Sequence, residues 1–285
     1  MLKESHIFSA GYKLSTLERR GTSDELYILL HGWEDNSGSF IPLIHKLNPE
    51  YHLLAIDMLG HGQSEHISGQ SFYHFDDFID ILQGIIQQQH NKKITLIGHS
   101  FGGFIAFIYT AFFTPKIKNL ILIESAGPYS ISDNMLLNTH HEAQICRQQY
   151  RQNPSYHHHD NIEDLISLRA KKNQVAPSVM QYIVRRGVKL QEEGYIWSHD
   201  KKLDYIMGSK FTRTSIRQAA QQISCHTLFI LGSAGNPKMR TYAKERSQEM
   251  PDAQVFCIEG GHYIHLELPE KVAEIIYKNP QQPRL

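Results

Sequence analysis

The stretch "ITLIGHSFGG", residues 94–103, joins a short apolar run to a serine that is flanked by glycines. The apolar run predicts a buried strand, and the following pattern "GGFIAFIYTAFF", at 102–113, predicts a helix. The G-x-S-x-G sequence of Gly98, Ser100 and Gly102 therefore lies at a strand-to-helix junction. A turn this sharp excludes side chains beside the serine and raises its hydroxyl above the sheet edge, at the helix N-terminus. We interpret Ser100 as a nucleophile; the alternative is an ordinary glycine-rich turn.

Similar apolar runs recur along the chain and alternate with helical patterns. Their length and their Ile, Leu and Val content are typical of strands buried on both faces of a parallel sheet. This alternation predicts an α/β fold, a mostly parallel sheet flanked by helices and joined by right-handed crossovers. The predicted strands are residues 25–31, 52–57, 94–99, 119–124, 227–232 and 254–260, and the clearest helical patterns are 75–89, 102–113 and 269–278.

The alternation is interrupted once, at residues 128–222. This segment contains no convincing buried strand and has helical patterns at 161–172 and 178–190. It lies between two predicted core strands, so we expect a helical cap insertion above the carboxyl edge of the sheet, where open α/β sheets bind ligands. The predicted core is then formed by residues 1–127 and 223–285.

The overall composition limits the kinds of partner. The 29 basic residues balance the 29 acidic residues, so the net charge does not favour nucleic acid or an anionic membrane surface as a binding partner. No apolar run approaches the roughly 20 residues of a membrane-spanning helix, and "MLKESHIFSA" lacks the apolar region of a secretory signal. The cysteines are three in number and form no C-x-x-C pair, which indicates a reducing, cytoplasmic setting. We expect a small-molecule partner and make no prediction of oligomeric state.

The histidine-rich stretch "SYHHHDN", residues 155–161, suggests a metal site. A run of consecutive histidines on a polar segment is only a compositional hint of metal binding. The chain also lacks a helical histidine pair at i and i+4 with a glutamate base. We interpret this stretch as a solvated loop and expect neither a metal nor another cofactor.

A second turn, "LLHGWEDN" at residues 29–36, follows an earlier predicted strand. The backbone N–H groups of Trp33 and Phe101 are predicted to form an oxyanion hole, the pair of fixed donors that stabilises a tetrahedral intermediate. We interpret His31 as a hydrogen-bonded structural residue. The Trp33 side chain is a candidate pocket wall.

The stretch "EGGHYIHLELPEKV", residues 259–272, places a histidine in a glycine-flanked loop between the last strand and the last helix. His262 is the predicted general base, and His265 is the alternative. In hydrolases with a serine elbow of this kind the chain order is serine, acid, histidine. An acid between Ser100 and His262 is therefore expected.

Four motifs, "HGW", "DMLGHGQS", "GHSFGG" and "GGHYIHLELPE", occur in the order found in α/β-hydrolase-fold serine hydrolases. The chain resembles that family over nearly its whole length. More narrowly, "HGWEDNSGSFIPLI", "LILIESAGP" and "RRG" followed by "WSHDKKL" resemble the serine hydrolase-like group related to kraken. The resemblance implies a hydrolase of carboxylic esters or related acyl substrates, with a Ser-His-acid triad and a helical cap. We predict that it acts without a metal, through an acyl-enzyme intermediate.

The sequence departs from the family in the position of the acid. The family usually carries G-x-x-D after the seventh strand, but here Gly232 is followed at the aspartate position by Gly235, and Asn236 is no carboxylate. Relatives such as haloalkane dehalogenases place the acid after the sixth strand, where this chain has Glu124. Neighbouring strands lie about 4.8 Å apart, so the carboxylate stays at the same sheet edge. We predict Glu124 as the triad acid, the alternative being a turn-capping role.

The sequence also allows other candidates for the triad acid and other activities. Asp200 is the next candidate acid, although the resemblance suggests that it anchors the cap, and Asp57 is interpreted as a turn residue. A carboxylesterase is the leading activity, and a serine nucleophile disfavours dehalogenase and epoxide hydrolase chemistry. A C–C bond hydrolase or an acyltransferase would use the same triad. A noncatalytic ligand-binding protein is the rival from another class, favoured by the missing aspartate.

Overall fold

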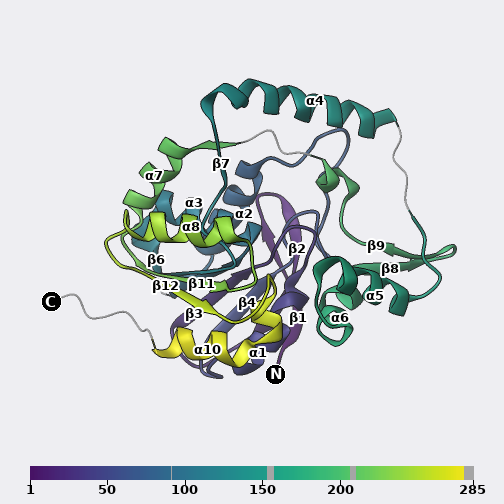
Figure 1. The fold of residues 1–285 in the computed structure, drawn as a ribbon. Coiled ribbons are helices and arrows are strands. Elements are labelled where there is room, and N and C mark those ends of the chain that lie inside the picture. Colours follow the sequence, from purple (N-terminus) through teal and green to yellow (C-terminus); the bar gives the residue numbers. More distant parts are fainter. Residues whose placement is uncertain (91, 153–156, 206–209, 279–285) are drawn as a thin grey trace.

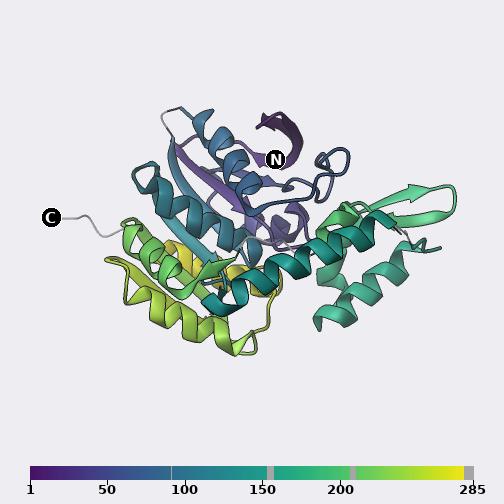
Figure 2. The ribbon, with the colours of Figure 1, turned by 90° about the horizontal axis from the view of Figure 1, so that it is seen from above.

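The computed structural model describes the chain except residues 91, 153–156, 206–209 and 279–285. Within this part, eight strands form one sheet in the order β1-β2-β4-β3-β5-β6-β11-β12, and helices cover both of its faces (Figures 1 and 2). The predicted α/β class is confirmed. The strands are β1 (Lys3–Ser9), β2 (Tyr12–Arg19), β3 (Glu25–Leu30), β4 (His52–Ile56), β5 (Lys93–His99), β6 (Ile117–Ile123), β11 (His226–Gly232) and β12 (Ala253–Ile258).

The parallel part of the sheet corresponds to the six predicted strands. These strands, from β4 through β3, β5, β6 and β11 to β12, pair in parallel, whereas β1 and β2 add an antiparallel hairpin at one edge. The hairpin turn consists of Ala10 and Gly11, both with positive φ (47° and 83°), as tight two-residue hairpin turns require.

The helices of the core lie in two layers. On one face α2 (Phe75–Gln87), α3 (Phe101–Phe113) and α8 (Pro237–Ser247) pack in one hydrophobic core. On the other face α1 (Ile41–Lys46) and α10 (Pro269–Lys278) pack in a second core. Strand β3 contributes alternate residues to the two cores, which is the pattern of a strand covered on both sides. Short turns of helix are η1 (Ser37–Phe40), η2 (Thr114–Lys116) and α9 (Ile264–Glu267).

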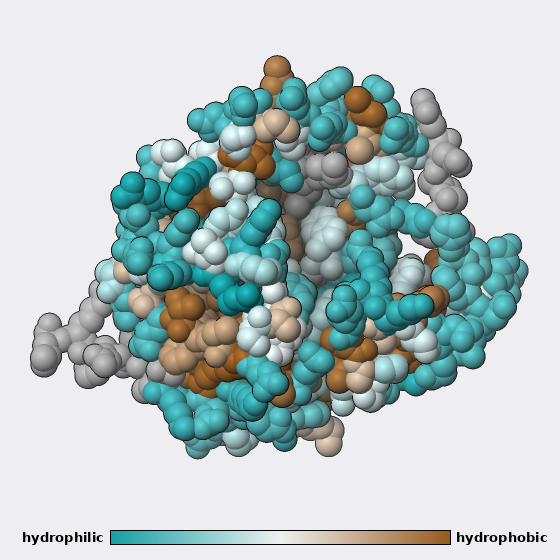
Figure 3. All heavy atoms as spheres, in the orientation of Figure 1, coloured by the Kyte–Doolittle hydropathy of each residue, from teal (hydrophilic) through white to brown (hydrophobic). Residues whose placement is uncertain are grey.

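Strand β12 corrects the expectation of burial on both faces. It lies at the edge of the sheet, its residues are partly buried or exposed, and Val255 is 40% exposed. A hydrophobic surface patch lies over β12 and α10 at the lower left of Figure 3. The apolar run alone does not distinguish an edge strand from a central one.

The segment 128–222 is only partly helical. It contains α4 (Leu136–Gln152), α5 (Ile162–Asn173), α6 (Pro177–Arg186) and α7 (Arg213–Gln222), with the short helices η3 (Asp133–Met135) and η4 (Lys201–Asp204). It also contains a hairpin of β8 (Val188–Gln191) and β9 (Gly194–Trp197), so the helix predicted at 178–190 is wrong beyond Arg186. Gly187 ends α6 there, with its N–H bonded to the Val184 carbonyl.

The two ends of this segment lie side by side. Strands β7 (Ser130–Ile131) and β10 (Phe211–Thr212) pair in parallel, and α7 then returns to pack against α3 of the core. Seen from above, α4 runs from the core toward α5, α6 and the hairpin (Figure 2). In the described part of the chain, every helix falls short of the combined length and hydrophobicity of a membrane span.

Candidate active site

Ser100 lies at the tight turn between β5 and α3. Its backbone has φ 50° and ψ −114°, a region that a residue with a side chain rarely adopts. The Ser100 N–H donates to the Ile123 carbonyl (3.1 Å), which fixes the turn against the end of β6. A Cβ atom at Gly102 would lie 2.1 Å from the Leu30 carbonyl oxygen, and one at Gly98 would lie 2.4 Å from the Gly103 Cα. The glycines around Ser100 are therefore required by backbone contact.

Glu124 follows β6 directly and has a positive φ of 47°. Its side chain is 1% exposed. Oε2 lies 3.2 Å from Nδ1 of His262, and Oε1 accepts a hydrogen bond of 2.5 Å from the Gly232 N–H. The carboxylate therefore joins the end of β11 to the histidine that follows β12.

Gly235 lies against this carboxylate. A Cβ atom at this position would be 2.4 Å from Glu124 Oε2 and 2.7 Å from Oε1. The Glu124 side chain thus fills the space that a side chain at residue 235 would need. Arg240 donates to the carbonyl oxygens of Gly232 (3.0 Å) and Gly235 (3.3 Å), which holds this loop around the carboxylate.

His262 has a half-exposed side chain (40%) and contacts the residue that precedes Ser100. The ring of His99, the residue before Ser100, lies 4.7 Å from the His262 ring, and its Nε2 donates to the His262 carbonyl (2.9 Å). In the described part of the chain, no hydrogen bond joins Ser100 to the His262 ring. In enzymes without substrate such contacts are often long and tighten on binding.

His265, the alternative base, lies in the core rather than at the surface. It is fully buried, and neither ring nitrogen has a hydrogen-bond partner among the described residues. Burial lowers the pKa of His265 to about 3, so the ring is neutral. Among the residues that the structure describes, His265 has no carboxylate partner, in contrast to His262.

The alternative acid and the other polar candidates have partners elsewhere. Asp200 accepts from the Tyr73 hydroxyl (2.8 Å) and caps η4. Asp57 is buried and accepts backbone hydrogen bonds from Ser37 and Gln63. These contacts agree with the expected anchoring and turn roles.

His31 has both ring nitrogens bonded to the backbone. Nδ1 donates to the Gly32 carbonyl (2.7 Å), and Nε2 accepts from the Met58 N–H (2.9 Å). Burial lowers the pKa of His31, so this neutral tautomer persists. The ring supports the loops at the strand ends, as expected of a structural residue. Asn236 in turn caps α8.

The predicted oxyanion donors come from two neighbouring elements. Phe101 begins α3, and Trp33 lies in the turn after β3, which the Asp35 N–H closes by donating to the Gly32 carbonyl (3.1 Å). The rings of Trp33 and Phe101 pack edge to face at 4.7 Å. Among the described residues, neither the Trp33 N–H nor the Phe101 N–H has an acceptor. The lack of a competing acceptor is a condition that an oxyanion donor must meet.

Two pockets flank this turn. One of about 360 Å³ has aromatic walls that include Trp33, Phe101 and Phe211. The other, of about 420 Å³, is more polar and is lined in part by Glu34, Arg169 and Trp197. Asp204 borders both pockets. Tyr182, a further aromatic residue of the segment 128–222, lies at a separate surface pocket.

The histidine run is only partly described, because Ser155 and Tyr156 lie outside the described residues. His158 Nε2 lies 3.2 Å from Glu193 Oε2, and His159 pairs with Tyr195 of β9 through the backbone. Within the residues that the structure describes, no three His, Cys, Asp or Glu side chains are placed together to hold a metal ion.

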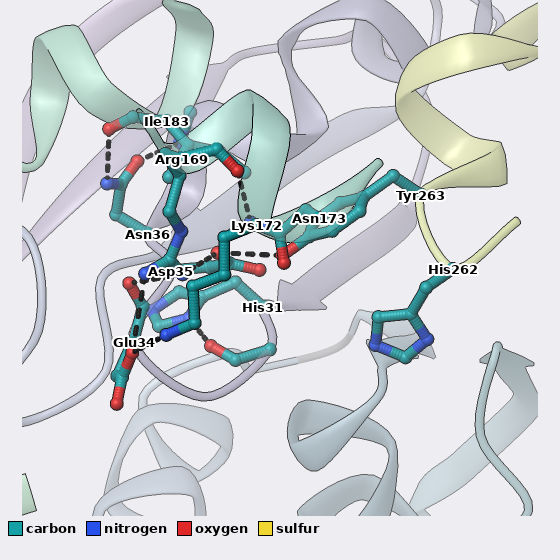
Figure 4. A network of polar contacts seen from close by, with 12 residues as sticks. His31, Glu34, Asp35, Asn36, Arg169, Lys172, Asn173, Ile183, His262 and Tyr263 are labelled. Carbon is teal, nitrogen blue, oxygen red and sulfur yellow. Dashed lines mark hydrogen bonds and ion pairs between the residues drawn. The ribbon is translucent and has the colours of Figure 1, made fainter. Parts of the chain in front are cut away.

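The sequence did not reveal several of the supporting contacts. The Gly232 N–H, the space at Gly235 and the Arg240 contacts all depend on how β6 and β11 lie together. Arg169 of α5 contacts the Trp33 turn from 134 residues away in the chain (Figure 4). The only sequence signal for the first three was the glycine at the position of the family aspartate.

Residues 27–269 match the profile of the alpha/beta hydrolase fold family. The chain belongs to this family. Among curated proteins, this α/β hydrolase is 30% identical over 264 residues to a probable serine hydrolase of Drosophila melanogaster, covering 88% of this chain and 79% of the relative. It is 26% identical over 267 residues to serine hydrolase-like protein 2 of Homo sapiens, covering 87% of this chain and 84% of the relative. The resemblance to the serine hydrolase-like group is confirmed, and the chain is a member of a hydrolase family.

Solved structures give the same fold for this α/β hydrolase. A hypothetical protein from Pseudomonas aeruginosa superimposes with a TM-score of 0.87 at 22% identity, covering 96% of this chain and 98% of its own. A thioesterase domain from the curacin biosynthetic pathway superimposes with a TM-score of 0.83 at 18% identity, covering 97% of this chain and 99% of its own. At these identities the likeness establishes the fold alone.

Proposed function

We propose that this α/β hydrolase cleaves carboxylic esters or related acyl substrates through an acyl-enzyme intermediate. The observation that carries the proposal is the contact of Glu124 with His262, at 3.2 Å, beside the strained turn of Ser100. A strained serine, a histidine and a buried carboxylate at one sheet edge are the parts that nucleophilic acyl transfer requires.

In the proposed mechanism, Ser100 Oγ attacks the carbonyl carbon of the substrate while His262 Nε2 accepts the hydroxyl proton. The carbonyl oxygen becomes an oxyanion and binds the N–H groups of Trp33 and Phe101. The intermediate collapses, the bond to the leaving group breaks, and His262 returns its proton to that group. Water then attacks the acyl-enzyme with the same histidine as base, and the acid product leaves with Ser100 restored.

Glu124 has a defined part in this scheme. Its Oε1 is held by the Gly232 N–H, which leaves Oε2 for the Nδ1–H of His262. This bond orients the ring with Nε2 toward the serine and stabilises the imidazolium that forms during attack. Since Gly235 carries no side chain, the carboxylate from β6 takes the place of the family's usual aspartate.

The pocket walls favour an apolar acyl group. The 360 Å³ pocket, lined by Trp33 and Phe101, begins at the proposed oxyanion donors and is built mainly from aromatic side chains. The more polar pocket beyond Glu34 would receive the leaving group. A thioester is a related substrate, which the likeness to a thioesterase domain makes worth testing. We keep C–C bond hydrolysis, acyl transfer and noncatalytic binding as alternatives.

We also propose that residues 128–222 form a cap over the core. The pairing of β7 with β10 supports an inserted unit, and the packing of α7 on α3 suggests that the cap proper ends before α7. In the described part of the chain, Cys146, Cys225 and Cys257 form no disulfide, which agrees with the reducing, cytoplasmic location that we propose. We propose that the enzyme needs no metal or other cofactor.

A labelling experiment tests the mechanism. A fluorophosphonate probe should modify Ser100, and Ser100→Ala should lose both the label and the turnover of p-nitrophenyl esters. A series of these esters with increasing acyl length would report the acyl preference. Turnover by Ser100→Ala at the wild-type rate would contradict the proposal, and retained ligand without an acyl-enzyme would favour the noncatalytic alternative.

A further inference from the structure

Arg169 of α5 reaches from the proposed cap to the turn that carries Trp33 (Figure 4). Its residue is 7% exposed. Nη1 lies 3.3 Å from Glu34 Oε2, while Nη2 donates to the Glu34 carbonyl (3.3 Å) and to Asp35 Oδ1 (3.0 Å). One guanidinium therefore holds both the backbone and the side chains of the two residues after Trp33.

The turn needs such support because of the conformation of Glu34. The Asp35 N–H bonds to the Gly32 carbonyl, so Trp33 and Glu34 are the central residues of a four-residue turn. Glu34 has a positive φ of 59° in its third position, where such turns favour glycine. A glutamate there is sterically disfavoured, and contacts outside the turn must hold it.

Asp35 also links Arg169 and the Trp33 turn to the loop that carries His262. Its side chain is 1% exposed, and Oδ1 also accepts from the hydroxyl of Tyr263 (3.4 Å), the residue after His262. Figure 4 shows Arg169, Asp35 and Tyr263 converging from α5, the Trp33 turn and the loop after β12. The cap, the proposed oxyanion turn and the base loop thus meet at one buried carboxylate.

We propose that Arg169 is a positioning residue, which holds the Trp33 N–H in place for the oxyanion by fixing the conformation of Glu34. Docking of the cap then completes the oxyanion hole. This inference rests on the proposed function of the same site. Arg169 also lines the polar pocket, so a direct role in substrate binding is the competing explanation, and it would change KM rather than kcat.

The first variant is Arg169→Lys. Lysine keeps a positive charge beside Asp35, but it lacks the planar guanidinium group whose several N–H donors reach Glu34 and Asp35 together. We expect kcat for a p-nitrophenyl ester to fall about 10-fold or more, since loss of one oxyanion donor costs about 10² to 10³ in kcat and here the donor is displaced. KM should change less than about 3-fold, and labelling of Ser100 by fluorophosphonate should slow in parallel.

Arg186→Lys is the matched control. Arg186 of α6 is another buried arginine of the cap segment, and it pairs with the buried Asp57 rather than with Glu34 or Asp35. A general loosening of the cap would affect both variants alike. We expect kcat of Arg186→Lys to stay within about 2-fold of the wild-type value, because of these two arginines it is Arg169 that contacts Glu34 and Asp35.

Rescue by glycine separates positioning from other roles. Glycine adopts a positive φ without steric cost, so adding Glu34→Gly to Arg169→Lys should recover about 3-fold or more of the lost kcat. If Arg169→Lys folds poorly, Asp35→Asn gives a second variant, which should lower kcat in the same direction. Circular dichroism and thermal unfolding would establish that each variant is folded.

Three outcomes would overturn the inference: an unchanged kcat in Arg169→Lys, a rise in KM alone, or a double variant with no recovery. These outcomes are distinct from failure of the proposed function. If Ser100→Ala abolishes turnover while Arg169→Lys is fully active, only the positioning role is wrong. If Ser100→Ala is active, the proposed mechanism itself is wrong.

Discussion

The Glu124 carboxylate makes one hydrogen bond to the backbone N–H of Gly232 and one contact with His262. Replacement by glutamine keeps the size but removes the charge that stabilises the imidazolium, and it permits the wrong tautomer of the histidine. We expect Glu124→Gln to lower kcat by about 10² to 10⁴, since the equivalent change in serine proteases costs about 10⁴. Steady-state kinetics with a p-nitrophenyl ester would measure the loss.

Two variants serve as controls for this prediction. Asn236→Ala removes a helix cap, and Asp200→Asn changes a carboxylate bonded to Tyr73, so each should cost far less in kcat. A nearly normal kcat in Glu124→Gln together with a large loss in Asp200→Asn would mean that the acid is misassigned.

Among the single residues of the candidate site, the sequence indicated those that belong to a motif and missed those that do not. Ser100, His262 and Glu124 each occupy a position defined by a neighbouring strand or glycine. The roles of Gly235 and Arg169 depend on contacts between segments far apart in the chain. The glycine at position 235 pointed to an acid elsewhere, but the sequence alone does not show that the Glu124 side chain fills the space beside it.

Among the elements, the ends of β6 and β11 offer two positions for one carboxylate. Any side chain at residue 235 would collide with Glu124, so Gly235→Asp requires a smaller residue at position 124. We expect the double variant Glu124→Gly with Gly235→Asp to regain at least about 10-fold in kcat over Glu124→Gly alone, because an aspartate then reaches the histidine from β11. Glycine at position 124 also tolerates the positive φ found there.

The single variants of this pair provide the comparison. Gly235→Asp alone should be less stable than the wild type, because its side chain overlaps the Glu124 carboxylate. Thermal unfolding and esterase kinetics on all three variants would test both statements. A double variant no more active than Glu124→Gly would show that the end of β11 does not reach His262.

Helix α6 is joined to the core by a buried ion pair. Arg186 donates to Asp57 (3.1 Å), to Ser15 (2.9 Å) and to Glu4, and its side chain is 6% exposed. We expect Arg186→Met to lower the free energy of unfolding by about 3 to 5 kcal/mol, because it leaves Asp57 as a buried charge without its partner. Urea unfolding would measure this change.

The neighbouring Arg185 provides the control. It pairs with Glu163 at the surface, where both side chains are at least half exposed. Arg185→Met should therefore cost less than about 1 kcal/mol. Equal losses in the two variants would argue against a special contribution of the buried pair.

The strands and helices that the sequence predicted are those with a clear hydrophobic pattern. The six parallel strands are short apolar runs, and α2, α3 and α10 have clear helical spacing. The hairpins β1–β2 and β8–β9 were missed because β1 and β8 are largely exposed and because β1, β2 and β8 carry many polar residues. Such strands form through pairing and turn geometry rather than through burial, which a hydrophobic pattern does not record.

For the whole molecule, four buried histidines link folding stability to pH. Burial lowers the pKa of His31, His61, His99 and His265 below the ordinary value of 6.5, for His265 to about 3. The unfolded chain therefore binds more protons below about pH 6.5 than the folded protein does. Stability is full above that pH and decreases as the pH falls toward the folded pKa, by up to about 1.4 kcal/mol per histidine and pH unit.

The variant His265→Leu tests this linkage. It removes a ring with unpartnered nitrogens and replaces it with an apolar group of similar volume. Between pH 6.5 and 5 the variant should lose about 1.5 to 2 kcal/mol less of its unfolding free energy than the wild type. Urea unfolding at both pH values would measure this, with the exposed His45→Leu as control. If the unfolding free energy of His265→Leu changed with pH as much as that of the wild type, the link between His265 and the pH dependence of stability would be wrong.

The short parallel pair of β7 and β10 brings the entry and exit of the proposed cap together at the core. An insertion whose ends are adjacent can be replaced by another insertion without interrupting the strands of the sheet. The contacts of Arg169 with Glu34 and Asp35 restrict such an exchange. A grafted cap would bring a new binding surface, but under the proposed role of Arg169 it would support the full kcat only if it also supplied an arginine at that place.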